Sequence, residues 1–504
     1  MVGSEVLEEC GEKISKKESK KRAAKLEKLL RKQEREEATS SSLSLEEEDE
    51  SCSSNYGDVT TNELQSAVEG KELTDVSNLV EEIVGSEVSI RGRLHKNRLV
   101  GTKLFVILRE SGFTVQCVVE ETRVGANMIK FVKQLSRESV VELIGVVSHP
   151  KKPLTGTTQQ VEIHVRKMYC LSRSLPNLPL VVEDAARSES DIEKSGKDTR
   201  LNNRVLDIRT PANQAIFRIQ CQVQIAFREY LQSKGFLEIH TPKLIAGSSE
   251  GGSAVFRLDY KGQPACLAQS PQLHKQMAIC GDMRRVFEVG PVFRAEDSFT
   301  HRHLCEFVGL DVEMEIRMHY SEIMDLVGEL FPFIFTKIEE RCPKELESVR
   351  KQYPFQSLKE AGEEVDPLGD LNTESERKLG QLVLEKYKTE FYMLHRYPSA
   401  VRPFYTMPYE NDSNYSNSFD VFIRGEEIMS GAQRIHDPEL LEKRARECGI
   451  DVKTISTYID AFRYGAPPHG GFGVGLERVV MLLCALNNIR KTSLFPRDSQ
   501  RLTP

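Results

Sequence analysis

The 504-residue sequence predicts an α+β protein in which a small β-barrel precedes a larger domain that combines an antiparallel sheet with helices. Two observations predict this organisation. The first region has five short strand patterns with one helical pattern after the third, and the second alternates long helical patterns with apolar strand patterns. A third observation, the strong charge bias of residues 1–83, separates a basic N-terminal extension from both domains.

The N-terminal extension is first basic and then acidic. Residues Lys13–Arg35 are dense in lysine and arginine, and residues Ser40–Ser54 are rich in serine with an acidic run. Lysines that would share one helical face are Lys17, Lys21, Lys28 and Lys32. Such a helix would attract an RNA backbone, whereas the alternative is a solvated, partly disordered charge run. We expect a helical or disordered basic segment, then a disordered linker that ends at residue 83.

Residues 84–180 have the strand pattern of a small barrel domain. Val88, Ile90 and Leu94 alternate with polar residues, which predicts a half-buried first strand. The further predicted strands are Lys103–Arg109, Phe113–Glu120, Val140–Val147 and Val161–Leu171, and the predicted helix is Ala126–Leu135. Five strands with one helix after the third are typical of the OB-fold, a Greek-key barrel that binds oligonucleotides.

Two side chains of the predicted barrel suit contacts with RNA bases. Phe105 alternates with the apolar residues Leu104 and Val106, and Gln116 follows the apolar Val115. We therefore expect both on the outer face, where a ring can stack on a base and an amide can bind a base edge. The alternative, which these residues by themselves favour, is that Phe105 is a core residue and Gln116 an ordinary surface residue.

Residues 181–200 are acidic and polar, and they predict a hinge before the large domain, residues 201–504. In that domain Asn213–Lys234 has the spacing of a long helix, and Leu476–Leu486 has that of a buried helix. The predicted strands are Val286–Val292, Phe307–Glu315, Ser418–Arg424 and Glu427–Gln433. Strands and helices in this order indicate an antiparallel sheet covered by helices.

Composition limits the classes of function. The 11 cysteines include no CxxC pair, which argues against a structural zinc site and a disulfide framework and favours a reducing compartment. No apolar run approaches the roughly 18 residues that span a bilayer, and no secretory signal is visible. We therefore expect a cytoplasmic protein without a membrane contact. Because the net charge is −7, RNA binding would depend on local basic patches.

Two short segments gather residue types that bind phosphates and bases. Residues 290–307 read GPVFRAEDSFTHRHLCEF, and residues 470–478 read GGFGVGLER. Their charged and aromatic members include Arg294, Glu296, His301, Arg302, His303, Phe307 and Arg478. Arginine forks match phosphate oxygens and stack on bases, and glycines allow a backbone to approach a ligand or a strand closely. Together the two segments indicate a clamp for a nucleoside triphosphate.

These segments resemble motifs of the class II aminoacyl-tRNA synthetases. FRAE…THRH..EF is similar to motif 2, GxGxGLER to motif 3, and GFLEIHTPKL (Gly235–Leu244) to motif 1, in the family's order. The blocks SSEGG, AQSPQLHKQ, GEEIMSGAQR and FPRD resemble eukaryotic cytosolic aspartyl-tRNA synthetases, and the resemblance covers Val84–Pro504. It implies ATP-dependent attachment of L-aspartate to tRNA(Asp) through aspartyl-adenylate, for protein synthesis.

The resemblance also implies site residues. It assigns catalysis to Arg294, Glu296 and Arg478. It assigns ATP to Arg294, Glu296, His303, Leu304, Phe307, Glu427, Gly475 and Arg478, and aspartate to Ser249, Glu250, Gln272, Lys275, Asp311, Ser430 and Arg434. It assigns Mg²⁺ to Glu427, Ser430 and Asp420, the anticodon to Phe105 and Gln116, and a homodimer interface to the motif 1 region around Pro242. The implied partners are tRNA(Asp), ATP, L-aspartate and a second copy of the chain, and membership of a multi-synthetase complex stays open.

Two of these assignments carry a physical condition. A carboxylate ligand needs cationic partners, so Lys275 with Arg434 favours aspartate over asparagine, unless Lys275 is instead exposed on a helix surface. Glu427 and Ser430 are three residues apart, a spacing that does not place them on one face of a strand. They can share one metal ion if a bulge lies near Ile428–Met429, and otherwise Glu427 is a salt-bridge residue.

The sequence departs from the family at two places. Phe299 stands where motif 2 usually has a small polar residue, and it would either add stacking or hinder access of the tRNA end. The segment Tyr353–Glu364 is shorter than in relatives by roughly fifteen or more residues, and the loss would expose a sheet edge. The alternative function is therefore an activity-impaired paralogue or splice form that acts as a tRNA-binding or regulatory protein.

Related enzymes are further alternatives. Asparaginyl- or lysyl-tRNA synthetase is disfavoured by Lys275 together with Arg434, because asparaginyl relatives lack the lysine. Ammonia-dependent asparagine synthetase shares the catalytic fold, but it has no anticodon barrel.

Overall fold

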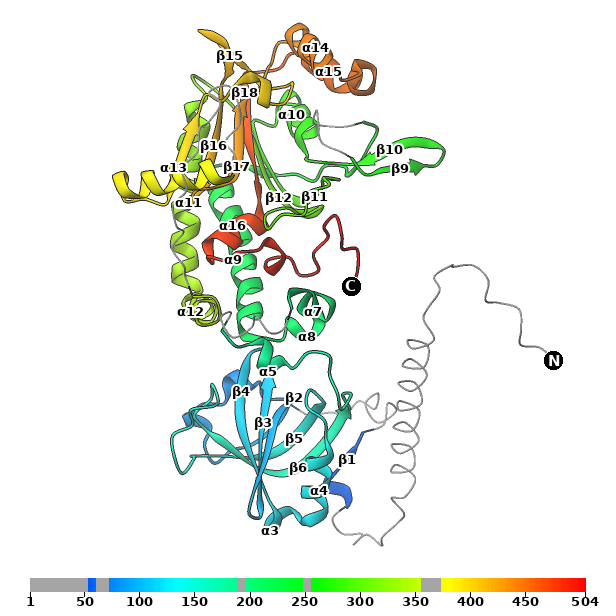
Figure 1. The fold of residues 1–504 in the computed structure, drawn as a ribbon, viewed down its shortest axis with the longest axis vertical. Helices are drawn as coiled ribbons and strands as arrows, with labels where there is room; N and C mark the ends of the chain where they lie inside the picture. The colour runs from blue at the N-terminus through cyan, green and yellow to red at the C-terminus, as the bar shows by residue number, and fades with distance from the viewer. Residues whose placement is uncertain (1–52, 60–71, 189–195, 248–254, 355–372) are drawn as a thin grey trace, which may run out of the picture. The chain divides into compact units, whose positions relative to one another are not determined.

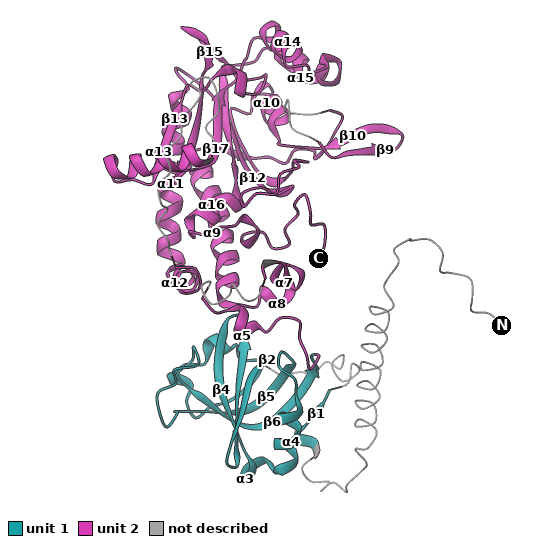
Figure 2. Cartoon of the chain, in the orientation of Figure 1, with its two compact units in different colours: residues 1–174 teal, residues 175–504 magenta. Residues whose placement is uncertain are grey.

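The computed structural model describes residues 53–59, 72–188, 196–247, 255–354 and 373–504. The basic segment and most of the linker expected from the sequence lie outside the described residues. The chain forms two compact units, residues 1–174 and residues 175–504 (Figure 2). Within the described ranges, each helix is too short or too polar to span a lipid bilayer.

The first unit is a closed β-barrel with five long strands (Figure 1). The strands are β2 (Glu87–Val100), β3 (Lys103–Glu110), β4 (Phe113–Glu120), β5 (Val140–Ser148) and β6 (Glu162–Ser172). Their order is β6-β4-β3-β2-β5, and a further pairing of β5 with β6 closes the barrel. The helices α3 (Glu121–Val124) and α4 (Ala126–Gln134) follow β4. The predicted OB-fold with helical structure after its third strand is therefore confirmed.

Residues before Val84 also belong to this barrel. Strand β1 (Tyr56–Asp58) pairs in parallel with β6, and Val76 and Leu79 are buried in the barrel core. The barrel therefore extends into the range that we assigned to the extension and linker. A three-residue strand and two isolated apolar residues are too short to show a periodic pattern, which is why the sequence did not reveal them.

The second unit is built around a seven-stranded sheet. In spatial order its strands are β13 (Phe391–His395), β16 (Ser418–Ile423), β17 (Glu426–Gln433), β18 (His469–Gly475), β12 (Glu306–Glu315), β11 (Arg285–Phe293) and β7 (Leu237–Glu238). All neighbours are antiparallel except β11 and β7. The predicted antiparallel sheet is confirmed, and each of its four predicted strands is present.

Helices cover one face of this sheet and form the main core with it (Figure 1). They are α9 (Pro211–Ser233), α11 (Ser321–Arg341), α12 (Pro343–Gln352) and α16 (Leu476–Leu483). Helix α9 begins after Thr210, whose hydroxyl accepts a hydrogen bond from the Asn213 amide at 3.4 Å. Its buried residues Ile216, Val223 and Phe227 recur at helical spacing, so one stripe of α9 packs on the sheet.

The other elements surround this framework. Helices α10 (Gln272–Cys280), α14 (Pro438–Glu447) and α15 (Ser456–Arg463) share a smaller core with Phe404 and Ile435. The remaining helices are α5 (Val182–Ala185), α7 (Lys197–Asn202), α8 (Arg204–Asp207) and α13 (Thr373–Tyr387). The remaining strands are β8 (Leu244–Ile245), β9 (Arg257–Tyr260) and β10 (Gln263–Leu267) in one small sheet, and β14 (Pro408–Tyr409) with β15 (Asp412–Ser416) in another.

Strand β18 pairs with β12 and β17 so closely that side chains are excluded at some of its positions. A Cβ atom on Gly471 would overlap the carbonyl oxygen of Val312 and would lie 2.5 Å from Glu313 Oε2. A Cβ atom on Gly470 would lie 2.6 Å from the carbonyl oxygen of Ala432. The glycine run therefore allows close approach of neighbouring strands as well as of a ligand.

Replacing Gly471 with alanine should destabilise the second unit by about 1–3 kcal/mol, the usual cost of forcing a methyl group into a packed site. The measurement is the urea midpoint of unfolding, followed by circular dichroism. Gly475→Ala is the matched control, because its added Cβ would lie 3.7 Å from Arg478 Cβ, an ordinary contact distance. Equal midpoints for the two variants would contradict this account.

Candidate active site

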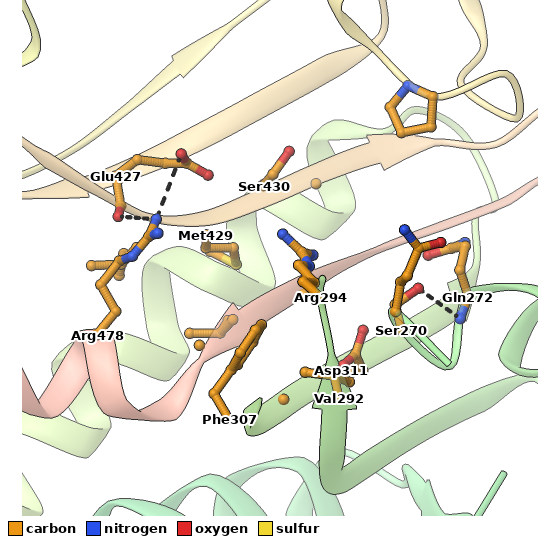
Figure 3. A pocket seen from close by; sticks show the side chains of 18 of the residues that line it. Ser270, Gln272, Val292, Arg294, Phe307, Asp311, Glu427, Met429, Ser430 and Arg478 are labelled. Carbon is orange, nitrogen blue, oxygen red and sulfur yellow. Dashed lines mark hydrogen bonds and ion pairs between the residues drawn. The ribbon is translucent and has the colours of Figure 1, made fainter. Parts of the chain in front are cut away.

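A cavity of about 370 Å³ lies on the face of the sheet opposite to the main helical core (Figure 3). Strands β11, β12, β17 and β18 line it, together with the loop after β11 and the first turns of α10 and α16. The expected site residues that line it are Gln272, Arg294, Glu296, His303, Leu304, Phe307, Asp311, Glu427, Ser430, Arg434, Gly475 and Arg478. Folding thus brings together residues that are far apart in the sequence.

The alternation of side chains along two strands shapes the floor of this cavity. On β12, Phe307 and Asp311 line the cavity, while Leu310 and Val312 join the helical core. Opposite Asp311, the neighbouring strand β18 has Gly473, which also lines the cavity. Because glycine has no side chain, the floor stays open for a ligand.

Cationic groups gather at the end of the cavity formed by α16 and the loop after β11. In Figure 3, Arg294 lies between Arg478 on one side and Asp311 on the other. Arg478 donates a hydrogen bond to the carbonyl oxygen of Glu427 at 3.1 Å and lies 3.8 Å from the carboxylate of the same residue. The guanidinium carbon of Arg294 lies 5.6 Å from the ring centre of Phe307. This arrangement places two guanidinium groups and an aromatic face where phosphates and a base can bind.

His303 lies in the same loop, where its imidazole is neutral and can act as a hydrogen-bond donor. Burial lowers the pKa of His303, and although Glu296 opposes the shift, Arg478 adds to it. The Nδ1 atom of His303 lies 2.5 Å from Thr300 Oγ1 and 3.2 Å from Ser298 Oγ. These contacts orient the ring, and a neutral imidazole can still donate a hydrogen bond to a phosphate oxygen.

Helix α13 supplies two residues that the sequence analysis missed. Glu376 pairs with Arg302 at 2.8 Å, and Arg377 pairs with Glu426 at 2.7 Å, which in turn lies 3.4 Å from His301. Burial raises the pKa of Glu376 to about 7, while Arg302 opposes this shift. No local pattern links α13 to this loop, so the contacts became visible only in the folded chain.

Lys275 and Arg434 belong to one buried charge cluster. Lys275 Nζ lies 3.1 Å from Asp311 Oδ1 and 3.4 Å from Glu313 Oε2, and Arg434 Nε lies 3.0 Å from Glu313 Oε1. Lys275 is 2% exposed, so the alternative of an exposed surface lysine is wrong. Both cations are paired within the protein, because the carboxylates of Asp311 and Glu313 face them. Arg434 and Asp311 line the cavity, and Lys275 contacts Asp311 from the buried side.

Glu313 is the centre of this cluster and was not singled out from the sequence. Burial alone would raise the pKa of Glu313, but the charges of Arg434 and Lys275 outweigh burial and hold that pKa below its ordinary value. The available signal was the period of two along β12, which places Glu313 on the same face as Phe307 and Asp311.

A hydrogen-bonded network adjoins the cluster, because the Arg434 backbone amide donates to the carbonyl oxygen of His469 at 2.8 Å. His469 Nδ1 donates to the carbonyl oxygen of Pro467 at 2.8 Å, and His469 Nε2 lies 2.9 Å from Gln276 Nε2. Burial lowers the pKa of His469, so its neutral ring accepts at Nε2. The Gln276 side-chain oxygen accepts from Tyr458 at 3.0 Å and from Gln272 at 2.9 Å. Because each donor in this network meets an acceptor, the network does not need a charge on His469.

Strand β17 contains the bulge that a shared metal site requires. The register against β16 shifts by one residue, and Ile428 is the residue without a partner on that strand. As a result Glu427 and Ser430 both line the cavity (Figure 3). The condition that a bulge lies near Ile428–Met429 is therefore met.

The third residue expected at the metal, Asp420, has a different environment. It pairs with Arg402 at 2.6 Å, and Arg402 also donates to Ser430 Oγ at 2.7 Å. Burial raises the pKa of Asp420 to about 6, although Arg402 opposes the shift. Arg402 lines the cavity and was missed, because its partners are distant in sequence.

These side chains fit a hard cation in part. Glu427 and Ser430 present oxygen atoms to the cavity, and Asp420 Oδ1 is buried without a hydrogen-bond partner in the described structure. Among the described residues, no three histidine, cysteine, aspartate or glutamate side chains are grouped to hold a metal ion. An ion here would therefore need ligand oxygens from a bound nucleotide as well.

Other expected residues lie elsewhere. Ser249 and Glu250 lie outside the described residues. Pro242 is exposed, and so is the nearby Leu244, at 49%. An exposed apolar side chain at this position is compatible with a subunit interface, which stays a prediction.

In the barrel unit, Phe105 and Gln116 are half-buried on the outer face, while Leu104 and Val106 are buried inside. Gln116 Nε2 donates to Glu162 Oε2 at 2.9 Å. The alternation that we predicted is present, and binding of bases by these residues stays a prediction.

Replacing Glu313 with glutamine should destabilise the second unit by about 3–5 kcal/mol near neutral pH, because it leaves two buried cations with one carboxylate fewer. The folded-state pKa of Glu313 lies below its ordinary 4.5, so its contribution is present above that value and is lost as the pH falls below it. Urea unfolding at several pH values measures both effects.

The matched control is Glu315→Gln on the same strand, where the carboxylate forms a surface pair with Arg284 at 2.7 Å. It should change stability by less than about 1 kcal/mol. A Glu313→Gln defect that keeps the same size at every pH would contradict the assigned ionisation.

Comparison with protein families gives two matches. Residues 196–499 match the model of tRNA synthetases class II (D, K and N), and residues 88–171 match the OB-fold nucleic acid binding domain. The two matched ranges correspond to the two compact units of the structure.

Named relatives match over nearly the whole chain. Aspartate–tRNA ligase 1, cytoplasmic, from Arabidopsis thaliana is 95% identical over 532 aligned positions that cover 100% of both proteins. Because this chain has 504 residues, at least 28 of the 532 positions have no residue here. The cytoplasmic aspartate–tRNA ligase of Homo sapiens is 48% identical over 86% of this chain and 91% of its own length.

Solved structures agree with these relatives. An aspartyl tRNA synthetase from Entamoeba histolytica matches with a TM-score of 0.80 and 44% identity, over 91% of this chain and 97% of that one. An asparaginyl-tRNA synthetase from Pyrococcus horikoshii, complexed with asparaginyl-adenylate, matches with a TM-score of 0.77 and 31% identity, over 86% and 100%. The fold, the cavity and these relatives together show that this chain belongs to the aspartate–tRNA ligase family of class II tRNA synthetases.

Proposed function

We propose that this chain attaches L-aspartate to tRNA(Asp) in two steps with aspartyl-adenylate as the intermediate. The aspartate α-carboxylate attacks the α-phosphorus of ATP and pyrophosphate leaves. A terminal ribose hydroxyl of the tRNA then attacks the acyl carbon, and AMP leaves. Neither step needs a protein nucleophile, so the protein contributes positioning and charge stabilisation.

The charge count of the buried cluster supports aspartate as the amino acid. Two cations, Lys275 and Arg434, face two carboxylates, Asp311 and Glu313, so the cluster is balanced without a ligand. An α-ammonium group bound to Asp311 would neutralise that carboxylate and leave one cationic charge for the ligand side chain. Aspartate supplies the matching carboxylate there, whereas asparagine would leave the charge buried and unpaired. This balance is the observation that carries the proposal.

The other cavity residues take the nucleotide in this proposal. Arg294, between the two ends of the cavity, stabilises charge on the α-phosphate, with Glu296 in the same loop orienting the nucleotide. His303 and Arg478 bind the outer phosphates. Phe307 offers its ring to the adenine, and the guanidinium of Arg478 covers the other face. Leu304 and Gly475 form part of the surrounding wall.

Glu427 and Ser430 would hold Mg²⁺ together with phosphate oxygens, with Asp420 behind them. The ion would neutralise phosphate charge during adenylate formation. The oxygen atoms that face the cavity and the unpaired Asp420 Oδ1 support this assignment.

The proposal extends to the partners of the chain. The outer barrel face with Phe105 and Gln116 binds the anticodon, and the exposed motif 1 region around Pro242 forms a homodimer. We place the protein in the cytoplasm, in agreement with the names of its relatives. Ser249 and Glu250 are assigned to the aspartate on sequence alone.

Amino-acid-dependent ATP–pyrophosphate exchange tests the proposal. We expect exchange with aspartate and at least about a hundredfold lower kcat/KM with asparagine, the scale set by an unpaired buried charge. Lys275→Met should lose most aspartate activity, whereas the control Lys443→Met, on the exposed face of α14, should not. Equal activity with asparagine would refute the aspartate assignment, and no exchange with any amino acid would favour an activity-impaired form.

Charging of tRNA tests the barrel face separately. Phe105→Ala and Gln116→Ala should lower charging of tRNA(Asp) about five- to hundredfold, the range expected for one lost base contact. The exchange reaction serves as the internal control and should stay normal, because it needs no tRNA. Normal charging by both variants would mean that other residues read the anticodon.

A further inference from the structure

The chain after α16 holds the loop that carries Arg302 and His303. The Ile489 amide donates to the carbonyl oxygen of His301 at 2.8 Å, and Arg490 Nη1 donates to the carbonyl oxygen of Thr300 at 2.9 Å. Consecutive residues of one segment therefore bind consecutive carbonyl groups of the other.

Arg490 adds a second contact through Phe299. Its guanidinium carbon lies 4.4 Å from the ring centre of Phe299, which is within the range of a cation–π interaction. Phe299 is 54% exposed, while Arg490 is 5% exposed, so the arginine covers one face of a ring that otherwise meets solvent. The departure of Phe299 from the family pattern thus has a partner in the folded chain.

Arg490 is itself held rigidly. Its Nε atom donates to Asp498 Oδ2 at 2.6 Å, and both side chains are buried. The adjoining backbone is held by Arg204, which donates to the carbonyl oxygens of Ser493 at 2.8 Å and Leu494 at 3.0 Å. The guanidinium plane is therefore held by contacts that do not involve the loop.

The contact chain continues into the cavity. Thr300, whose carbonyl group Arg490 binds, also places its hydroxyl 2.5 Å from His303 Nδ1. Arg302 and His303 line the cavity, but Arg490 does not. Arg490 can therefore act on a bound nucleotide only through the loop.

From these contacts we infer that Arg490 is a positioning residue for the triphosphate. Its contacts with the Phe299 ring and the Thr300 carbonyl group, which we call the clasp, fix Arg302 and His303 toward the phosphates. This inference rests on the proposed function, since it assigns ATP to the cavity. It gives Phe299 a role as an anchor for the loop. A loss of the clasp should loosen the phosphate side of the cavity and leave the aspartate side, built on α10 and β12, unchanged.

The test compares Arg490→Gln and Phe299→Ser with the unmodified chain in aspartate-dependent exchange. We expect Arg490→Gln to raise the KM for ATP at least about tenfold and Phe299→Ser about threefold or more, while the KM for aspartate changes less than about twofold. Phe299→Tyr keeps the ring and should restore a normal KM. Because both changes break one clasp, the double variant should be no worse than Arg490→Gln alone.

Calorimetric binding of a non-hydrolysable ATP analogue gives a readout without turnover. Arg490→Gln and Phe299→Ser should both bind the analogue more weakly than the unmodified chain does. The matched control is Arg501→Gln, from the same C-terminal segment, whose side chain contacts Asn202 at 2.7 Å. It should bind the analogue normally.

The outcomes distinguish the positioning role of Arg490 from the proposed function of the chain. An unchanged ATP affinity in Arg490→Gln and Phe299→Ser, or a lower kcat with both KM values unchanged, would overturn the positioning role and leave a structural role. Analogue binding with no amino-acid-dependent exchange in the unmodified chain would instead refute the proposed function while the clasp is still tested by binding.

Discussion

The pairing of β12 with the glycine-rich strand β18 is the constraint on which the catalytic unit depends. One face of β12 packs apolar residues such as Leu310 and Val312 into the helical core. The other face carries Asp311 and Glu313 beneath the cavity, opposite Gly473 and Gly471. A side chain at Gly471 would overlap the backbone of β12. The pairing of β12 with β18 therefore requires glycine at this position, and the same pairing places the acidic residues beneath an open floor.

The acidic residues of β12 explain how the fold tolerates buried cations. Lys275 and Arg434 would be strongly unfavourable in a buried site on their own, and Glu313 offsets this because both cations lie within 3.4 Å of its carboxylate. The network of Gln276, His469 and Tyr458 then holds the cluster from one side with neutral hydrogen bonds. A charged ligand would change the charge balance of this cluster, whose side chains are already in place. Binding would therefore need little rearrangement of these side chains.

The side of the cavity that carries Arg302 and His303 is organised differently. Its cationic residues lie largely on a loop, and a loop has no ladder of hydrogen bonds to hold it. Ion pairs from α13 and backbone contacts from the chain after α16 take that place, through Glu376 with Arg302 and through Arg490 with Thr300. The two halves of one cavity thus differ in how they are held, because one is part of a sheet and the other is a loop that contacts α13 and the chain after α16.

Short-range periodicity and local motifs predicted the OB-fold, the antiparallel sheet with its helices and twelve of the residues that line the cavity, because that information is local in the sequence. The spacing of Glu427 and Ser430 also set a condition for a shared metal site, a bulge near Ile428–Met429, because residues three positions apart do not otherwise share a face of a strand. The contacts of Glu313 with Lys275 and of Arg402 with Asp420, and the pairing of β1 with β6, became visible only in the folded chain. The physical reason is that these contacts join segments distant in the chain, and a local pattern does not record which buried charges or strand edges will meet.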